Sequence, residues 1–357
     1  MDKVLELFDT YRCHLKRRNI SMSDFLKQNY SNYIDDLKAS VEVIDNPTLG
    51  DVTCLMIKDH IDEIETNCES LIDILRLYEN GNQTAAAYKA SELFTRMKPQ
   101  MMFRYSGAIR KENYYRIRTY ESNPFPLDRK EMFHIPLGKN HLVRSERYSL
   151  PGHPCLYLAS QATLAWYECK KPDKFALAQF SIPQDEKHYL TLVDFAEKLM
   201  PMKHNFYCWF CNELDDVALI RKYLLKYIYI YPLRAACSVT VEHPGSAFIE
   251  EYVIPQLLLQ WILNDDDFDG VRYESCSNSD EVHTLGGHNL VLVTKDFDAD
   301  GFDKKLRKEV KLTLPKLYET NKSVSPTTFV SLLDGKKESE SRYLSGFDVK
   351  QCDFQNI

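Results

Sequence analysis

The hydrophobic pattern of this chain changes its period at Pro99. Before that residue, apolar side chains recur at every third or fourth position, which is the spacing of one face of an α-helix. After it, short runs typical of β-strands alternate with helical patterns, and Arg, Pro and aromatic residues become dense. Because helices and strands need different apolar spacings to bury one face, this change predicts a helical region followed by a region built on a sheet.

The first hundred residues carry three clear helical stripes. The stripes are Val4, Phe8, Tyr11 and Leu15; Ile61, Ile64, Cys68, Leu71 and Leu75; and Ala86, Ala90, Leu93, Phe94 and Met97. Asn80-Gly81-Asn82 should end one helix, because glycine readily adopts the left-handed conformation that follows many helices. Asn46-Pro47 and Leu49-Gly50 mark a loop. We expect roughly four amphipathic helices that pack as a small bundle over residues 1–100.

The pattern of residues 101–300 predicts both strands and helices. Strands are expected at residues 155–159, 175–180, 189–193, 237–241 and 289–294, and helices at residues 161–168, 213–227 and 246–263. This combination is typical of the α+β class, here a mixed β core with flanking helices. Residues 301–357 are rich in charge and in Lys and Ser. We expect them to form a charged C-terminal extension.

Charge and composition argue against several classes of protein. The net charge of −7 and the pI near 5.9 make a general nucleic-acid binder unlikely by composition. No apolar run reaches the ~18–20 residues that a membrane-spanning helix needs, and the N-terminus lacks the apolar core of a signal peptide. The ten cysteines are scattered, as expected for reduced, buried side chains. We expect a soluble, cytoplasmic protein.

Four segments of the second region carry residues suited to chemistry. They are Tyr115-Arg116-Ile117-Arg118; Arg147-Tyr148-Ser149 with Pro151-Gly152-His153-Pro154; the strand 155–159 with the helix that ends at Glu168; and Gly270-Val271-Arg272-Tyr273-Glu274-Ser275, followed by Gly287-His288-Asn289-Leu290. Each has a structural explanation when taken alone. An Arg beside tyrosines is usually a surface pair, a Glu at a helix end is usually solvated, and a Ser after a strand usually forms a turn.

Taken in order, these segments resemble the RES family, which is named for its Arg, Glu and Ser. The resemblance covers roughly residues 114–294. It implies a compact fold like that of ADP-ribosyltransferases and an activity on NAD⁺, and many members are toxins paired with an antitoxin. The helical region also resembles the HEPN bundles found ahead of such domains. It lacks their Arg and His at the catalytic spacing, so we expect either a non-catalytic sensing or docking module or a plain scaffold.

The resemblance assigns roles to individual residues. Arg116 matches the first arginine of the family, with Arg118 as its competitor, while Glu168 and Ser275 match the glutamate and the serine. Arg147 and Tyr148 match a second basic–aromatic pair. This chain departs from the family where Glu146-Arg147-Tyr148-Ser149 replaces Gly-Arg-aromatic-Asn, and Ser149 would take the place of the polar Asn. The expected catalytic residues are Glu168, Arg116 and Ser275, and the expected binding residues are Arg116, Arg147, Tyr148, Ser149, Arg118, His134 and Tyr157.

These residue types suit the cleavage of NAD⁺ independently of the resemblance. Arginine binds the two phosphates of a dinucleotide in bidentate fashion. Breaking the nicotinamide–ribose bond builds positive charge on the ribose, which a fixed carboxylate such as that of Glu168 would stabilise. Tyr148 would stack on the nicotinamide ring, and Ser275 would donate a hydrogen bond near the ribose. His134 could line the pocket, although a neutral loop histidine is the simpler interpretation.

Other motifs favour structural explanations. Cys208 and Cys211 with His204 could bind a metal ion, but a structural zinc site needs a second such pair, and a packed core segment fits better. The acidic run at residues 265–267 lacks the ligand spacing of a calcium loop. No Gly-x-Gly-x-x-Gly or Walker A sequence is present. We therefore expect no metal and no cofactor, with NAD⁺ as the substrate.

The sequence leaves three functions open. The first is an NAD⁺ glycohydrolase or phosphorylase that acts as a bacterial toxin or defence effector. The second is an ADP-ribosyltransferase that modifies a protein or nucleic acid, and the third is a non-catalytic nucleotide sensor. An antitoxin or regulatory partner and a homo-oligomer are possible assemblies under the first function.

Overall fold

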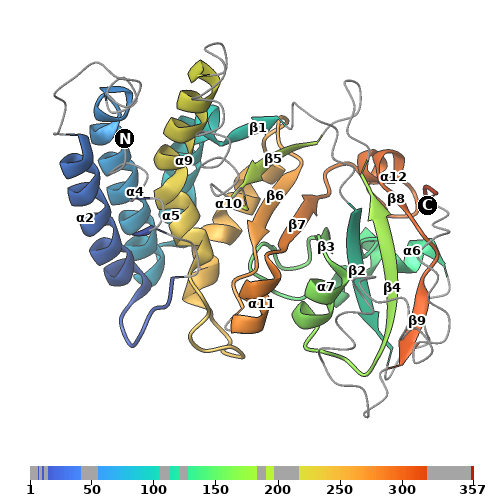
Figure 1. The fold of residues 1–357 in the computed structure, drawn as a ribbon. Coiled ribbons are helices and arrows are strands. Elements are labelled where there is room, and N and C mark those ends of the chain that lie inside the picture. The colour runs from blue at the N-terminus through green and yellow to red at the C-terminus, as the bar shows by residue number, and fades with distance from the viewer. Residues whose placement is uncertain are drawn as a thin grey trace. The chain divides into compact units, whose positions relative to one another are not determined.

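The computed structural model describes residues 7, 10–11, 15–41, 55–104, 113–120, 128–182, 190–196, 217–277, 279–319 and 355–357. By its internal contacts the chain forms two compact units. Unit 1 comprises Met1–Phe103 and Asp194–Trp261, and unit 2 comprises Arg104–Val193 and Ile262–Ile357. Helices make up most of unit 1 and a sheet with short helices makes up unit 2 (Figure 1), so the chain is of the α+β class that its periodicity predicts.

Unit 1 is built from long helices. They are α2 (Met22–Val41), α4 (Ile61–Glu79), α5 (Gln83–Met101) and α9 (Val217–Ser238), followed by the 3₁₀ turn η2 (Glu250–Tyr252) and α10 (Val253–Leu263), which runs on past the end of the unit. Helix α4 packs against α2, α5 and α9. The predicted stop after α4 is confirmed, because Gly81 has a φ of 80° and Asn82 caps α5 by accepting a hydrogen bond from the backbone N–H of Ala85. None of the helices in the described ranges is both long and apolar enough to cross a membrane.

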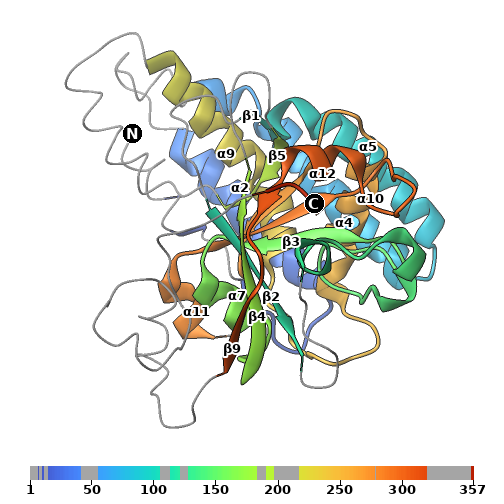
Figure 2. The same ribbon diagram turned by 90° about the vertical axis from the view of Figure 1, so that its right-hand side faces the viewer.

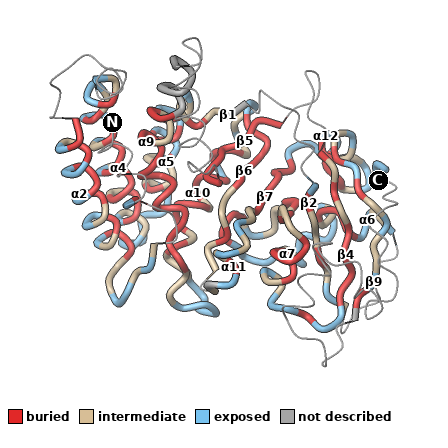
Figure 3. The backbone as a smooth tube through the Cα atoms, viewed as in Figure 1, coloured by how far each residue is buried: buried red, intermediate tan, exposed pale blue. Residues whose placement is uncertain are grey.

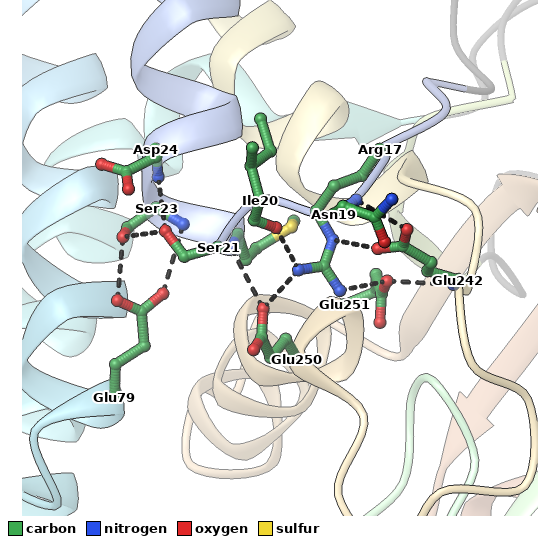
Figure 4. A network of polar contacts seen from close by, with 11 residues as sticks. Arg17, Asn19, Ile20, Ser21, Ser23, Asp24, Glu79, Glu242, Glu250 and Glu251 are labelled. Carbon is green, nitrogen blue, oxygen red and sulfur yellow. Dashed lines mark hydrogen bonds and ion pairs between the residues drawn. The ribbon is translucent and has the colours of Figure 1, made fainter.

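Residues 194–261 belong to unit 1 by their contacts, whereas the sequence pattern assigned them to the second domain. Part of the reason is a network around Arg17 (Figure 4). The guanidinium of Arg17 donates hydrogen bonds of 2.6 Å to Glu250 and 2.9 Å to Glu251, and the backbone N–H of Asn19 donates to Glu242. Nε of Arg17 also lies 3.6 Å from the carboxylate of Glu242, so one nearly buried cation gathers three carboxylates that lie more than 200 positions away, a pairing that local periodicity does not encode.

Two sequence expectations in this unit are wrong in detail. The predicted helix at residues 213–227 corresponds to α9, which extends much further, to Ser238. The apolar, partly β-branched run at residues 237–241 was expected to be a strand, but it contains the end of α9 and an isolated bridge between Lys16 and Thr240. Short apolar runs are compatible with a buried helix end as well as with a strand, and packing decides between them.

Unit 2 contains a sheet with the strand order β5-β6-β7-β3-β2-β4-β8, in which β9 also pairs with β4. The strands are β2 (Asn113–Thr119), β3 (Cys155–Ala159), β4 (Lys174–Ser181), β5 (Thr191–Asp194), β6 (Gly270–Glu274), β7 (His288–Val293), β8 (Lys311–Leu312) and β9 (Lys316–Glu319), and β1 (Met102–Arg104) lies at the boundary of the units. The helices are α6 (Arg129–Met132), α7 (Ala162–Glu168), α11 (Asp280–Leu285) and α12 (Lys304–Glu309), with the 3₁₀ turn η1 (Leu137–Leu142).

The predicted strands at residues 155–159, 175–180, 189–193 and 289–294 therefore correspond to β3, β4, β5 and β7. Residues 301–357 were expected to form a charged C-terminal extension. Instead, β8 and β9 pair with β4, and β9 lies at the edge of the sheet that faces the viewer in Figure 2. The exposed edge of β4 explains this pairing, because a strand edge presents unpaired backbone groups that a following segment can satisfy.

The two faces of the sheet carry separate apolar clusters. Face A carries the cluster of Tyr114, Phe133, Leu156, Leu158, Ala176, Ala178, Leu290 and Leu306 among others. Face B carries Ile117, Ala159, Ala162, Leu164, Ala165, Trp166, Phe175, Leu177 and Val282, and α7 covers it. Strands β6 and β7 are buried along much of their length (Figure 3). This division matters for the site, because alternation along a strand sends successive side chains to opposite faces.

Candidate functional site

Glu168 is the last residue of α7, and the way this helix ends fixes its position. The backbone N–H of Lys171 donates to the carbonyl of Trp166, and that of Lys170 donates to the carbonyl of Tyr167, both at 2.9 Å. Lys170 has a φ of 62°, so the chain turns into the left-handed region directly after the helix. This pair of bonds is a Schellman motif, which satisfies the last carbonyls and stops the helix. The side chain of Glu168 is exposed at the helix end.

Ser275 directly follows β6 and is buried. Its strand approaches β7 very closely at Gly270, where a Cβ atom would lie 2.0 Å from the carbonyl oxygen of Val291. Only glycine fits this position, and the tight pairing sets the register in which Tyr273 lies opposite Asn289. The register in turn places the end of β6, and with it Ser275, next to face B.

The structure brings Glu168 and Ser275 together. The hydroxyl of Ser275 donates a hydrogen bond of 2.6 Å to Oε1 of Glu168. The side-chain amide of Asn289 donates a second bond, of 2.7 Å, to the same oxygen. Oε2 of Glu168 accepts no hydrogen bond from any residue that the structure describes. One carboxylate oxygen is therefore anchored and the other remains available for a ligand.

Neighbouring groups respond to the charge of this carboxylate. The pKa of Tyr273 is raised well above its usual value, first by burial and then by Glu168. The pKa of Glu146 is also raised, by desolvation of its carboxyl and by the nearby charge of Glu168. This chain therefore places a second carboxyl group, that of Glu146, within electrostatic range of the first.

Arg116 and Arg118 lie on β2 with their Cβ atoms directed to face A. In the register of β2 and β4, Arg116 pairs with Ala178 and Arg118 with Ala176, and both alanines belong to the face A cluster. Glu168, by contrast, belongs to the helix that covers face B. The structure therefore does not bring Arg116 into hydrogen-bonding contact with Glu168 and Ser275, and strand alternation directs it to the other side of β2.

The guanidinium of Arg116 nevertheless acts electrostatically on both faces. Burial and the charge of Arg118 lower the pKa of Arg116 to about 9, while Cys169 and Tyr157 on face B oppose that shift. Nη1 of Arg116 is buried and has no hydrogen-bond partner among the described residues. Strands β2 and β3 share a single register pair, Tyr115 with Ala159, so they stop pairing next to Arg116. This position combines an unpaired guanidinium nitrogen with a break in the sheet.

Arg118 is used differently from Arg116. Its Nη2 donates a hydrogen bond of 3.0 Å to the carbonyl oxygen of Phe133, a buried residue of face A. Burial lowers the pKa of Arg118, and Glu131 partly offsets this effect. The contact gives Arg118 a structural task, which favours Arg116 as the arginine that is left for a ligand.

The segment Arg147-Tyr148-Ser149 is buried throughout. The ring of Tyr148 is fully buried, and its centroid lies 4.6 Å from the centroid of the Tyr273 ring. It therefore does not present a face for stacking on a nicotinamide. The hydroxyl of Ser149 is enclosed as well and bonds to the backbone of Glu146, which makes it a turn residue. Tyr157 donates a hydrogen bond of 2.7 Å to the carbonyl oxygen of Tyr148 and supports the same turn from β3.

His134 is also a structural residue. It is fully buried, its Nδ1 lies 2.9 Å from the carbonyl oxygen of Ile135, and its Nε2 accepts a hydrogen bond of 3.0 Å from the backbone N–H of Asp303. Because Nε2 accepts, the proton sits on Nδ1 and the ring is neutral. Burial lowers the pKa of His134 to about 4. The simpler interpretation of this residue, a neutral loop histidine, fits this geometry, and a place in the pocket does not.

Asn289 is the residue of the site to which the sequence pattern gave no role. It appeared only as the start of a predicted strand, although its segment was among those singled out. A polar amide in an otherwise apolar run, His288-Asn289-Leu290-Val291, is the signal that could have indicated it, since a buried amide needs a hydrogen-bond partner. Neither this segment nor any other in the described ranges assembles three or more metal-ligating side chains. Cys208, Cys211 and His204 lie outside the described residues.

Comparison with known proteins gives one informative similarity. No family model matches the chain, and no solved structure matches it. The chain is 31% identical over 164 residues to "Putative toxin YopC" of Bacillus subtilis (strain 168). The match covers 45% of this chain and 36% of that protein, so the chain spans little more than a third of the length of this relative. The similarity thus links part of this chain to part of a protein that is named as a toxin.

Proposed function

We propose that unit 2 binds NAD⁺ and cleaves its nicotinamide–ribose bond with Glu168 as the central catalytic residue. The observation that carries the proposal is the arrangement of this carboxylate: Oε1 is held by Ser275 and Asn289, and Oε2 is available at an exposed helix end. A carboxylate fixed in this way can stabilise positive charge without moving during the reaction, which is the main requirement of electrostatic catalysis.

The reaction makes a specific demand on this carboxylate. When the bond between the ribose C1′ and the nicotinamide nitrogen breaks, the bonding electrons leave with nicotinamide, which becomes neutral, and the ribose becomes an oxocarbenium ion. A water oxygen then bonds to C1′ and loses a proton to solvent, giving ADP-ribose. Oε2 of Glu168 would face the ribose and stabilise its charge as it develops, by the logic of glycoside cleavage.

Arg116 is the residue that we propose for the dinucleotide's phosphates. Its buried Nη1 has no hydrogen-bond partner among the described residues and lies where β2 and β3 stop pairing. Guanidinium groups bind phosphate oxygens in a bidentate manner and hold their charge at neutral pH. Since Arg116 and Glu168 do not touch, a ligand that reaches both must be extended, and a dinucleotide has such a shape.

The cellular role that we propose is that of a toxin which depletes NAD⁺. Support comes from the similarity to a protein named as a toxin. An enzyme of this kind needs restraint, and we propose that a protein partner acting as an antitoxin supplies it. Expression of the chain without such a partner should arrest growth, and the Glu168→Gln chain should not.

The direct test is an assay of the purified full chain with NAD⁺ labelled in the adenosine moiety. We expect release of nicotinamide, and Glu168→Gln should lower the rate by roughly 10²–10³-fold, because the amide keeps the shape and loses the charge. Glu92→Gln, the same change at an exposed position of α5, is the matched control and should leave the rate unchanged.

The products decide among the reactions. Labelled ADP-ribose in solution indicates hydrolysis, its 1-phosphate in phosphate buffer indicates phosphorolysis, and label on a macromolecule indicates transfer. Intact NAD⁺ after incubation with the folded wild-type chain would refute the proposed activity.

A further inference from the structure

We infer that Asn289 is a positioning residue for Glu168, and that it holds this carboxylate in place from the strand opposite Ser275. The inference deepens the proposed function and rests on it only for the identity of the reaction. It starts from a contact: Nδ2 of Asn289 lies 2.7 Å from Oε1 of Glu168, the atom to which Ser275 also donates.

The backbone of Asn289 is fixed on both sides. It pairs with Ala159 of β3 and with Tyr273 of β6, so Asn289 sits in the interior of the sheet. Its side chain is 7% exposed. A buried side-chain amide without a partner costs about 1–3 kcal/mol, and here Glu168 provides the acceptor. The amide of Asn289 therefore has little freedom to move. The carboxylate of Glu168, at an exposed helix end, can adjust its position to reach the amide.

Two donors on one oxygen restrict the orientation of the carboxylate more than a single donor does. The terminal torsion of a glutamate is broad, so one hydrogen bond leaves the carboxylate free to swing about the bonded oxygen. Ser275 approaches from the end of β6 and Asn289 from β7, and together they restrict the carboxylate plane. This restriction directs Oε2 away from both donors, which is the atom that the proposed reaction uses.

Asparagine also suits the electrostatics of the position. It donates through Nδ2 and carries no charge at any pH, so it adds a hydrogen bond to the carboxylate without placing a second charge beside it. Aspartate has nearly the same shape, but its second carboxylate would compete with Glu168 for one proton. Asn289→Asp therefore changes charge and donor while it conserves volume.

The experiment compares Asn289→Asp, Asn289→Ala and the wild-type full chain. The control is Asn113→Asp, the same chemical change at an exposed position of β2. We expect Asn289→Asp to shift the acidic limb of the pH–rate profile upward by about one pH unit or more. Asn289→Ala should lower kcat by roughly 10- to 100-fold with a smaller change in KM, because the carboxylate is misplaced and not removed. Asn113→Asp should behave as wild type.

A second readout does not depend on turnover. In chains with ¹³C-labelled glutamate carboxyls, the resonance of Glu168 is identified by its absence in Glu168→Gln. It should titrate at a higher pH in Asn289→Asp than in the wild-type chain. Failure of the wild-type chain to consume NAD⁺ would overturn the proposed function and leave this readout intact. An unshifted Glu168 resonance, or full activity of folded Asn289→Ala, would overturn the role of Asn289 itself.

Discussion

The hydroxyl of Ser275 lies 2.6 Å from Oε1 of Glu168, although 107 positions separate the two residues in the chain. The sequence pattern predicts that Ser275 donates a hydrogen bond near the ribose. The structure uses its hydroxyl to hold the carboxylate, so under the proposed function Ser275 would act on the substrate through Glu168. Substitutions of Ser275 therefore test how the carboxylate of Glu168 is held in place.

Ser275→Ala should reduce NAD⁺ cleavage by about tenfold while the fold is retained. Removing one of two donors loosens the carboxylate, and solvent can replace the lost bond because Glu168 is exposed. The measurement is kcat alongside the thermal unfolding midpoint. Ser275→Thr keeps the hydroxyl and should restore part of the rate; wild-type turnover by Ser275→Ala would remove this serine from the site.

Arg116 and Arg118 should separate into a binding and a structural arginine. Arg116→Ala should weaken NAD⁺ binding, seen as a raised Kd in calorimetry, with little loss of stability because Nη1 has no partner to lose. Arg118→Ala should lower the free energy of unfolding by about 1–3 kcal/mol, because the buried carbonyl of Phe133 loses its donor. The reverse pattern, with binding lost only in Arg118→Ala, would contradict the assignment.

His134 should make the protein less stable in mild acid. Its pKa is about 4 in the folded chain and near 6.5 when unfolded, so the unfolded state binds the proton first as the pH falls. The stability that His134 contributes is complete above pH 6.5, declines between pH 6.5 and 4, and is lost below that. The loss amounts to roughly 3 kcal/mol. Denaturant unfolding of wild type and His134→Asn between pH 4 and 7 tests this, and parallel curves would contradict it.

Gly270→Ala should destabilise unit 2 strongly. The added Cβ would lie 2.0 Å from the carbonyl oxygen of Val291, so β6 and β7 must move apart. We expect a loss of roughly 3 kcal/mol, at the upper end for an overpacked site. Gly138→Ala is the matched control, because a Cβ there meets nothing within 4 Å. Equal unfolding midpoints for the two variants would show that the strands tolerate the atom.

Apolar spacing along the chain was enough to predict the class of fold and much of its secondary structure. The helices α4 and α5, the strands β3, β4, β5 and β7, and a helix ending at Glu168 follow from periods of 3.6 and 2. These features are local, since each depends on side chains within a few positions. The strand predicted at residues 237–241 failed because so short a run fits both structures, and the surrounding packing made it the end of a helix.

Sequence alone also predicted that Glu168 and Ser275 lie in one site, together with Arg116. Only the tertiary structure showed that Asn289 also donates to Glu168 and that Tyr148 and His134 are buried. It also showed that the side chain of Arg116 projects from β2 on the face opposite α7. The reason is that the register between strands is not determined locally. Which strand neighbours which, and which face a residue takes, depends on backbone pairing between distant segments, and a shift of one position would send every side chain of a strand to the other face.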